Sequence, residues 1–279
     1  ETVVVADDVA LRDRVERDRR RGIAGTVLVH KVAGAASAAR LDLAAVAAEA
    51  RAAAASVGSM GVALGACTVP GGRAGFALGE DEMELGLGIH GEAGVRRAPL
   101  QPADAIVEEL LGAILADLAP RQGKRAVLLI NGLGGTPPME LAVVARYALA
   151  RLRANGIEIA RAWSGSLMTA LEMPGVSLSL MTVDDARLAR LDAPTDAPAW
   201  PGGGRLGTTS PVAMPVVAAA PKAGASAATP AGQAVRRSAL RIADALIAAE
   251  ARLTELDAAA GDGDLGLSAT RAAHAIRAL

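Results

Sequence analysis

The fold class is decided by Ala126-Val-Leu-Leu-Ile-Asn-Gly-Leu-Gly-Gly-Thr-Pro137 and the residues that follow it to Trp163. The first five residues are apolar and predict a buried strand, and the glycines after them predict a turn. Residues 138–153 predict a helix, and Ile157–Trp163 predicts a second strand. Strand, turn, helix and strand in this order are typical of an α/β domain with a mostly parallel or mixed sheet.

Working outward from this stretch, further short elements extend the same pattern. We expect strands at Val3–Ala6, 61–69, 75–78, 83–89 and 176–182, and helices at 39–57, 104–118 and 184–191. The sequence therefore predicts an α/β domain over residues 1–192, a mixed sheet with flanking helices.

The amino-acid composition changes after residue 192. Seven prolines lie among Gly, Ser, Thr and Ala between residues 193 and 232, and regular elements do not tolerate that density of proline. We interpret 193–232 as an interdomain linker. Beyond it, Gln233–Ala260 predicts one long helix and Ser268–Leu279 a second, so residues 233–279 form the start of an all-α domain.

Composition excludes several classes of function. The 279 residues carry 29 Lys and Arg against 30 Asp and Glu, and only 1% are aromatic, so neither a basic field nor stacking rings favour a nucleic-acid partner. The longest uncharged stretch, Ala52–Gly72, is broken by Gly and Pro, which argues against a membrane span. Cys67 is the single cysteine, which rules out an internal disulfide, so the cytoplasm is the expected compartment. We expect Cys67 to be a small buried residue.

The segment Met83-Glu-Leu-Gly-Leu-Gly-Ile-His90 alternates as a strand would. Gly86 and Gly88 share a face with His90, and the missing side chains would leave the backbone open to a small molecule. His90 is therefore a candidate functional residue; the alternative is a hydrogen-bonded structural histidine. We expect His30 to be structural and His274 to lie at the surface.

The turn at Asn131–Pro137 superficially resembles the dinucleotide fingerprint. Its glycines do not match G-x-G-x-x-G, and no acidic residue follows at about twenty residues after a second strand. We expect a tight turn between strand and helix, with no cofactor.

Three aspartates around Gly261 and Gly263 form the strongest local signal. Asp257 continues the apolar stripe of the preceding helix, and Asp262 and Asp264 follow in a flexible turn, so the three carboxylates can converge. Oxygen ligands of this kind suit Mg²⁺ or Ca²⁺, and the helix that begins near Ser268 would offer N–H groups to a phosphate. The alternative is an ordinary Gly-Asp turn.

Taken together, these segments resemble dihydroxyacetone kinase of the single-chain, ATP-dependent type. The matching stretches are Gly25-Thr-Val-Leu-Val-His-Lys-Val-Ala-Gly-Ala-Ala36, Met60–Leu64 with Cys67–Pro70, Glu82-Met-Glu-Leu-Gly-Leu-Gly-Ile-His-Gly-Glu92, Asn131–Pro137 and Leu253-Thr-Glu-Leu-Asp257 through Gly261-Asp-Gly-Asp264.

The resemblance implies a role for each candidate residue. His90 matches the histidine that adds to the ketone carbon of dihydroxyacetone as a covalent hemiaminal, and Asp257, Asp262 and Asp264 match the Mg²⁺ ligands that hold ATP. Ser268 would lie near the phosphates. The resemblance also implies that residues 1–192 are the later part of a dihydroxyacetone-binding domain, and residues 233–279 the first part of an ATP-binding barrel of helices, in a cytoplasmic homodimer.

The resemblance also shows what this segment lacks. The family's substrate domain begins well before Glu1 and carries the acid and base residues there, so we expect a chain truncated at both ends and inactive alone. The substrate would be dihydroxyacetone or a related short-chain ketose or aldose such as glyceraldehyde. The alternative is a non-catalytic protein of the same family that binds a carbonyl sugar or acts in regulation.

Overall fold

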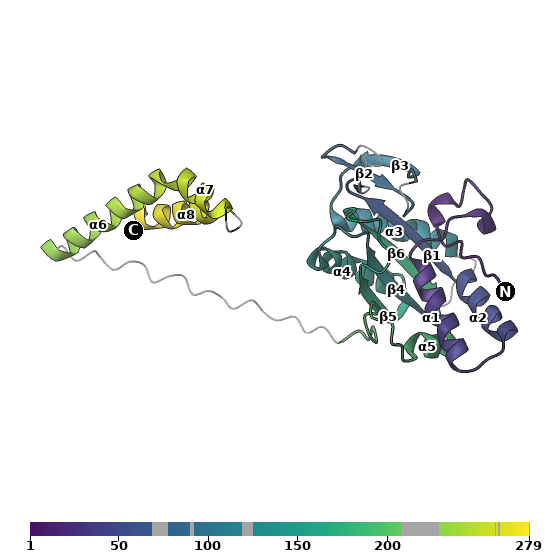
Figure 1. The fold of residues 1–279 in the computed structure, drawn as a ribbon. Helices are drawn as coiled ribbons and strands as arrows, with labels where there is room; N and C mark the ends of the chain where they lie inside the picture. The colour runs from purple at the N-terminus through teal and green to yellow at the C-terminus, as the bar shows by residue number, and fades with distance from the viewer. Residues whose placement is uncertain are drawn as a thin grey trace. The chain divides into compact units, whose positions relative to one another are not determined.

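The computed structural model describes residues 1–68, 78–89, 92–118, 125–207, 229–259, 261 and 263–278. They belong to two compact units, Glu1–Thr208 and Thr209–Leu279, each of which is described by itself (Figure 1). Within the described residues, no helix combines the length and the apolar character that a bilayer crossing requires.

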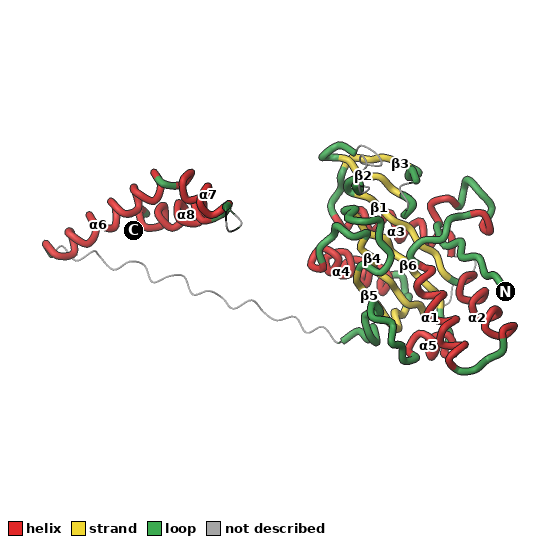
Figure 2. The backbone as a smooth tube through the Cα atoms, in the orientation of Figure 1, coloured by secondary structure: helices red, strands yellow, loops and turns green. Residues whose placement is uncertain are grey.

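The described strands of the first unit form one six-stranded sheet in the order β3-β2-β1-β6-β4-β5 (Figure 2). Only β4 and β5 are parallel among these strands, and every other neighbouring pair is antiparallel. This confirms the mixed sheet. The strands are β1 (Val57–Ala63), β2 (Glu82–Leu85), β3 (Arg96–Pro99), β4 (Arg125–Gly132), β5 (Glu158–Gly165) and β6 (Gly175–Thr182).

Helices cover both faces of this sheet because its central strands are apolar on both sides. Leu128 and Ile130 of β4 pack into one buried cluster, and Val127 and Leu129 pack into another, as the alternation of a strand requires. The first cluster includes α3 (Ala103–Leu118) and α4 (Pro138–Ala154), and the second includes α1 (Gly25–Ala38), α2 (Leu43–Ala55) and α5 (Asp185–Asp192).

The amino-terminal part of the unit differs from our expectations. Residues Val3–Ala6 are not a strand; the chain joins the sheet through a single bridge between Asp8 and Ser59. The predicted helix 39–57 proves shorter, as α2, and α1 before it was not predicted. Several residues of α1 are β-branched valines, which have low helix preference, and burial of one helix face outweighs that preference. Two short 3₁₀ helices, η1 (Val9–Leu11) and η2 (Arg17–Arg19), precede it.

The predicted strand 83–89 ends early, at Leu85. Gly86 has φ +67°, a left-handed conformation that turns the chain out of the strand direction. The strand β3, which we did not expect, pairs with β2 from Glu82 to Leu85.

The start of the expected linker belongs to the first unit. We call residues 194–204 the exit strap. Trp163 Nε1 donates a hydrogen bond to the carbonyl of Gly202 at 2.8 Å, and Ala162 N donates one to Gly204 at 2.9 Å. The Trp163 and Trp200 rings are 5.0 Å apart between centroids. The first unit therefore extends to Thr208, past the boundary that proline content suggested at residue 192.

The described part of the second unit is helical, as expected, but its first helix is divided. In place of one helix over 233–260, α6 (Pro230–Ala248) and α7 (Glu250–Ala258) meet at Ala249, whose ψ of 1° leaves the helical range. α8 (Leu265–Arg277) begins three residues before the predicted start at Ser268.

Candidate functional site

His90 and Gly91 lie outside the described residues, so the site is built from the segments on either side of them. Leu87 belongs to a small buried cluster with residues from three connections of the sheet: Ala63 and Cys67 at the end of β1, Leu133 after β4, and Ala170 and Met173 before β6. The carboxyl ends of β1 and β4 thus converge on the segment that leads to His90. Ligand sites of α/β proteins commonly form at such an edge.

The two glycines of this segment fill a different role from the one we expected. Both are buried. A Cβ on Gly86 would lie 2.5 Å from the Ala10 Cβ, and one on Gly88 would lie 2.2 Å from Glu92 Oε2. The missing side chains therefore permit close packing within the protein and do not leave an open face of backbone.

Buried acidic residues hold the same segment in place. Glu84, 4% exposed, accepts a hydrogen bond from Gly94 N at 2.6 Å through Oε1 and pairs with Arg97 Nε at 3.2 Å through Oε2. Asp8, on the other side, pairs with Arg21, which also contacts Gly86. These contacts brace the turns before and after His90.

Asp7 and Asp8, which directly follow residues Val3–Ala6, are both buried. Asp7 accepts hydrogen bonds from Ile23 N at 2.7 Å and Gly25 N at 2.8 Å, which fixes the start of α1. Burial raises the pKa of Asp7, against the opposing effect of hydrogen bonds from Ser59 and those two amides. A pair of acidic residues directly after Val3–Ala6 was the available signal, because carboxylates beside an apolar run need partners if buried.

The turn between β4 and α4 is tight, as predicted. Gly134 has φ +124°, and Thr136 Oγ1 donates to the Gly175 carbonyl at 2.7 Å and accepts from Gly175 N at 2.8 Å. Asn131 is fully buried, and its Oδ1 accepts hydrogen bonds from the amides of Leu167 and Met168. A cavity beside the turn is lined by Gly134–Pro138, Leu141 and Ser164–Ser166.

Two of the three candidate aspartates, Asp257 and Asp264, are described, and both lie at the start of α8. Asp257 Oδ2 accepts a hydrogen bond from Leu265 N at 3.1 Å, and Asp264 directly precedes the helix. Asp257 is half-buried and Leu256 is 58% exposed, so the predicted buried stripe is wrong at this end of α7.

Asp262 lies outside the described residues, and the residues that are described contain no cluster of three His, Cys, Asp or Glu able to hold a metal. The carboxylates of Asp257 and Asp264 supply oxygen donors beside a helix N-terminus, a donor set that fits Mg²⁺. Ser268 is exposed in the first turn of α8, where its amide donates to the Asp264 carbonyl at 2.9 Å.

The other candidate residues are not part of these groups. His30 is exposed and not structural, and it lines a cavity with Lys31 and Trp200. Burial lowers the pKa of Lys31, whose Nζ donates to the Ala193 carbonyl. His274 is exposed and Cys67 is buried, both as predicted.

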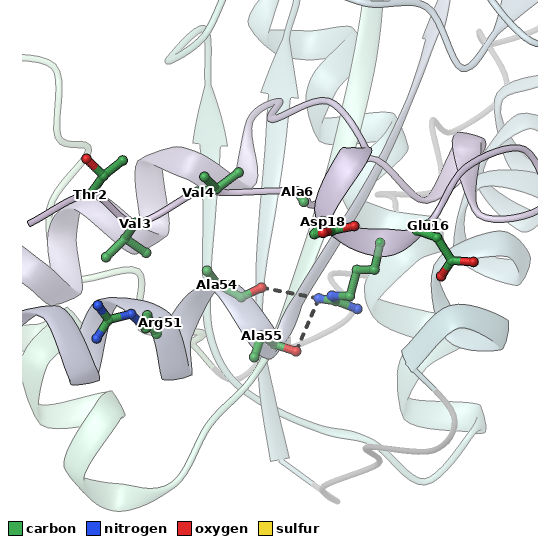
Figure 3. Close-up of a pocket in the computed structure, with 10 residues that line it drawn as sticks. Thr2, Val3, Val4, Ala6, Glu16, Asp18, Arg51, Ala54 and Ala55 are labelled. Atoms are coloured by element: carbon green, nitrogen blue, oxygen red, sulfur yellow. Dashed lines mark hydrogen bonds between the residues drawn. The ribbon is translucent and has the colours of Figure 1, made fainter.

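A further pocket lies between the amino-terminal segment and the end of α2. Figure 3 shows Val4 and Ala6 on one side and Ala54 and Ala55 on the other. The dashed lines mark the hydrogen bonds that Arg17 Nη2 donates to the Ala54 and Ala55 carbonyls, each 3.2 Å long. Arg17 thereby satisfies the free carbonyls at the end of α2, and the pocket contains none of the candidate site residues.

A mixed sheet covered by helices on both faces defines an α/β domain, and the glycine-rich segment braced where β1 and β4 end is its candidate ligand site. The family model of the Dak1 domain matches residues 1–199, and the chain belongs to that family.

Relatives and solved structures extend the similarity over both units. The chain is 42% identical to human triokinase/FMN cyclase over 285 residues, covering 99% of this chain and 49% of that protein. It is 52% identical to a putative 3,4-dihydroxy-2-butanone kinase of Solanum lycopersicum, over 77% of this chain and 37% of that protein.

The dihydroxyacetone kinase of C. freundii superposes with a TM-score of 0.70 at 32% identity, over 99% of this chain and 49% of its own. The same kinase in complex with AMP-PNP and Mg²⁺ gives a TM-score of 0.68. The chain thus spans about half the length of these kinases.

Proposed function

We propose that this chain is part of a kinase that transfers the γ-phosphoryl group of ATP to dihydroxyacetone or a related short-chain ketose or aldose such as glyceraldehyde. The observation that carries the proposal is the similarity to a dihydroxyacetone kinase over 99% of the chain, including the units on both sides of the linker. A protein that only bound a sugar would have no use for the second unit.

In the proposed mechanism, His90 captures the substrate through its carbonyl group. A neutral imidazole nitrogen adds to the ketone carbon, the carbonyl electron pair moves to oxygen, and oxygen gains the proton that the ring loses. Glycerol has the same hydroxyl groups but no carbonyl carbon, so this chemistry excludes it. The captured substrate would present one hydroxyl in a fixed position for phosphoryl transfer.

The second unit would hold the nucleotide. Asp257, Asp262 and Asp264 are the residues that would bind Mg²⁺, and Ser268, in the first turn of α8, would lie beside the phosphates. Magnesium supplies neutralisation of phosphate charge during transfer. A similar kinase has been solved with AMP-PNP and Mg²⁺, which supports the use of ATP and Mg²⁺. The second unit would be part of a barrel of helices.

The remaining parts of the proposal follow from the family. Residues 1–192 would be the later part of the dihydroxyacetone-binding domain and 233–279 the first part of the ATP-binding domain. The linker between them, 193–232, would begin with the exit strap, which packs on the first unit. The complete protein would act as a cytoplasmic homodimer. One similar protein is named a putative 3,4-dihydroxy-2-butanone kinase, which implies a four-carbon substrate, so substrate length is a question for measurement.

A binding experiment tests the role of His90 without phosphoryl transfer. We expect dihydroxyacetone labelled with carbon-13 at its ketone carbon to lose the ketone resonance and gain a tetrahedral one on the complete gene product. His90→Ala should abolish that change. A tetrahedral resonance that persists in His90→Ala would contradict the proposed capture, whereas capture without ATP consumption would favour the non-catalytic alternative.

A further inference from the structure

Arg21 is part of a chain of contacts that runs from the centre of the sheet to the segment before His90. The chain begins at Ser59 of β1, which forms a bridge with Asp8. Asp8 is completely buried, and its Oδ1 accepts a hydrogen bond from Ala10 N at 3.0 Å. Its other oxygen, Oδ2, is 2.8 Å from Arg21 Nε and 2.7 Å from Arg21 Nη2. Both carboxylate oxygens of Asp8 are therefore engaged.

The guanidinium then reaches the backbone of the turn after β2. Arg21 Nη2 donates a hydrogen bond to the Gly86 carbonyl at 2.8 Å, while Gly86 N donates one to the Gly61 carbonyl at 2.7 Å. The peptide groups around Gly86 are thus held from two sides, by β1 and by Arg21. A planar fork of donors can contact a carboxylate and a carbonyl at once, which a lysine cannot do with the same geometry.

The same side chain also lies against Gly88. A Cβ placed on Gly88 would be 2.9 Å from Arg21 Nη1. Leu87, between the two glycines, is buried in the cluster with Cys67 and Leu133. Arg21 and this cluster therefore fix residues 86–88, two positions before His90.

We propose that Arg21, held by Asp8, is a positioning residue: it fixes residues 86–88, which lead to the proposed capture residue His90, and efficient capture of the substrate carbonyl depends on this support. The inference rests on the proposed function and adds to it a residue 65 positions away from Gly86 in the sequence. Arg21 acts through the backbone of the turn and needs no contact with the substrate.

A neighbouring arginine provides a matched control. Arg20 Nη1 pairs with Asp117 Oδ1 at 2.9 Å, and both side chains are nearly buried, at 8% and 10% exposed. Like Arg21, it lies in the segment before α1 and pairs with an aspartate that is largely shielded from solvent. Its ion pair with Asp117 does not involve residues 86–89.

The experiment compares Arg21→Lys with Arg20→Lys in the complete gene product. We expect Arg21→Lys to raise the KM for dihydroxyacetone by about tenfold or more while kcat and the KM for MgATP change little, because misplacement affects capture of the carbonyl. Amide hydrogen exchange across residues 84–92 should be faster in Arg21→Lys than in Arg20→Lys. Arg20→Lys should keep wild-type values in both measurements.

A second variant approaches the same contact from the other side. Gly88→Ala would push against Arg21 and Glu92 without removing a buried charge, and it should raise the same KM. The proposal is overturned if Arg21→Lys and Arg20→Lys behave alike. It is also overturned if Arg21→Lys lowers the kcat of the reaction together with the stability of the protein. Wild-type turnover in His90→Ala would instead show that the proposed function has failed, and the role of Arg21 in capture would fail with it.

Discussion

Asp7 is a carboxylate that the fold almost completely removes from water, and it organises the start of α1. Its two oxygens accept hydrogen bonds from the amides of Ile23 and Gly25, and Gly25 has no room for a side chain because its Cβ would lie 2.5 Å from Asp7 Oδ2. A helix start has unpaired N–H groups, and here a side chain from eighteen residues earlier pairs with them.

Removing this carboxylate should destabilise the first unit strongly. Asp7→Ala leaves two buried amides without an acceptor, so we expect the free energy of unfolding to fall by about 3 kcal/mol. Urea denaturation of both variants checks this, with Asp13→Ala as the control, since the Asp13 side chain is 84% exposed. Equal stability of the two variants would contradict the role of Asp7.

The raised pKa of Asp7 also predicts how its contribution depends on pH. Because burial lifts the folded-state pKa above the ordinary value of 3.8, the folded protein binds the proton more tightly than the unfolded chain. The stabilising contribution is complete below pH 3.8 and is lost as pH rises through the folded-state pKa. As pH rises, the free energy of unfolding of the wild type should therefore fall relative to that of Asp7→Asn. A rise relative to Asp7→Asn would contradict the raised pKa.

Asn131, near the end of β4, performs a comparable task. It accepts from Leu167 N and Met168 N and donates through Nδ2 to the Met168 carbonyl and to Ser177 Oγ. Asn131→Ala should cost about 2–4 kcal/mol, because two half-buried residues of the β5–β6 connection and the buried Ser177 lose their hydrogen bonds to it. The exposed Asn155 provides the control in thermal unfolding. A cost below that of Asn155→Ala would rule out this role.

At the scale of elements, the exit strap links the edge strand β5 to the chain that leaves the first unit. Its conformation depends on Gly204, which has φ +59° and whose Cβ would lie 2.4 Å from Trp163 Nε1. Gly203 has open space around it within 4 Å. The two neighbouring glycines thus form a natural pair for comparison.

Gly204→Ala should release the strap, since a left-handed alanine costs about 1–2 kcal/mol before any clash. Trp163 and Trp200 are the two tryptophans of the chain, so their fluorescence reports the change directly. We expect emission to move to longer wavelength in Gly204→Ala and to stay at the wild-type position in Gly203→Ala. Identical spectra for the two variants would show that the strap does not depend on Gly204.

The elements that the sequence predicted well are those with a clear local pattern. β4, α4 and β5 have apolar or helical periodicity and terminating turns, and their predicted bounds lie within two residues of the observed ones. α1 was missed because its valines favour strands locally, and only packing against α2 and the sheet makes it helical. The division of α6 from α7 at Ala249 has no Pro or Gly to signal it.

The candidate site was only partly predictable for a related reason. His90 and the three aspartates were identified from local motifs, and their roles in substrate capture and metal binding remain predictions. The supports that the structure adds, such as Arg21 against Gly86 and Glu84 against Gly94, join residues that no short motif connects. Gly86 and Gly88 stand out in the sequence. The reason why glycine is needed there, close packing against Ala10 and Glu92, is visible only in the folded structure.

At the scale of the whole molecule, the chain carries two units and spans about half the length of its curated relatives. The first unit contains the proposed substrate residue and the second the proposed metal ligands. The central claim is that both are parts of one kinase, so one variant in each unit should abolish the same reaction.

The most direct measurement is therefore ATP-dependent phosphorylation of dihydroxyacetone by the complete gene product and by His90→Ala and Asp262→Ala. We predict that the wild type forms dihydroxyacetone phosphate and does not phosphorylate glycerol, and that each variant loses at least about a hundredfold in kcat/KM. Arg20→Lys, which keeps a positive charge beside Asp117, should retain activity. Turnover at the wild-type rate in both His90→Ala and Asp262→Ala would contradict the account.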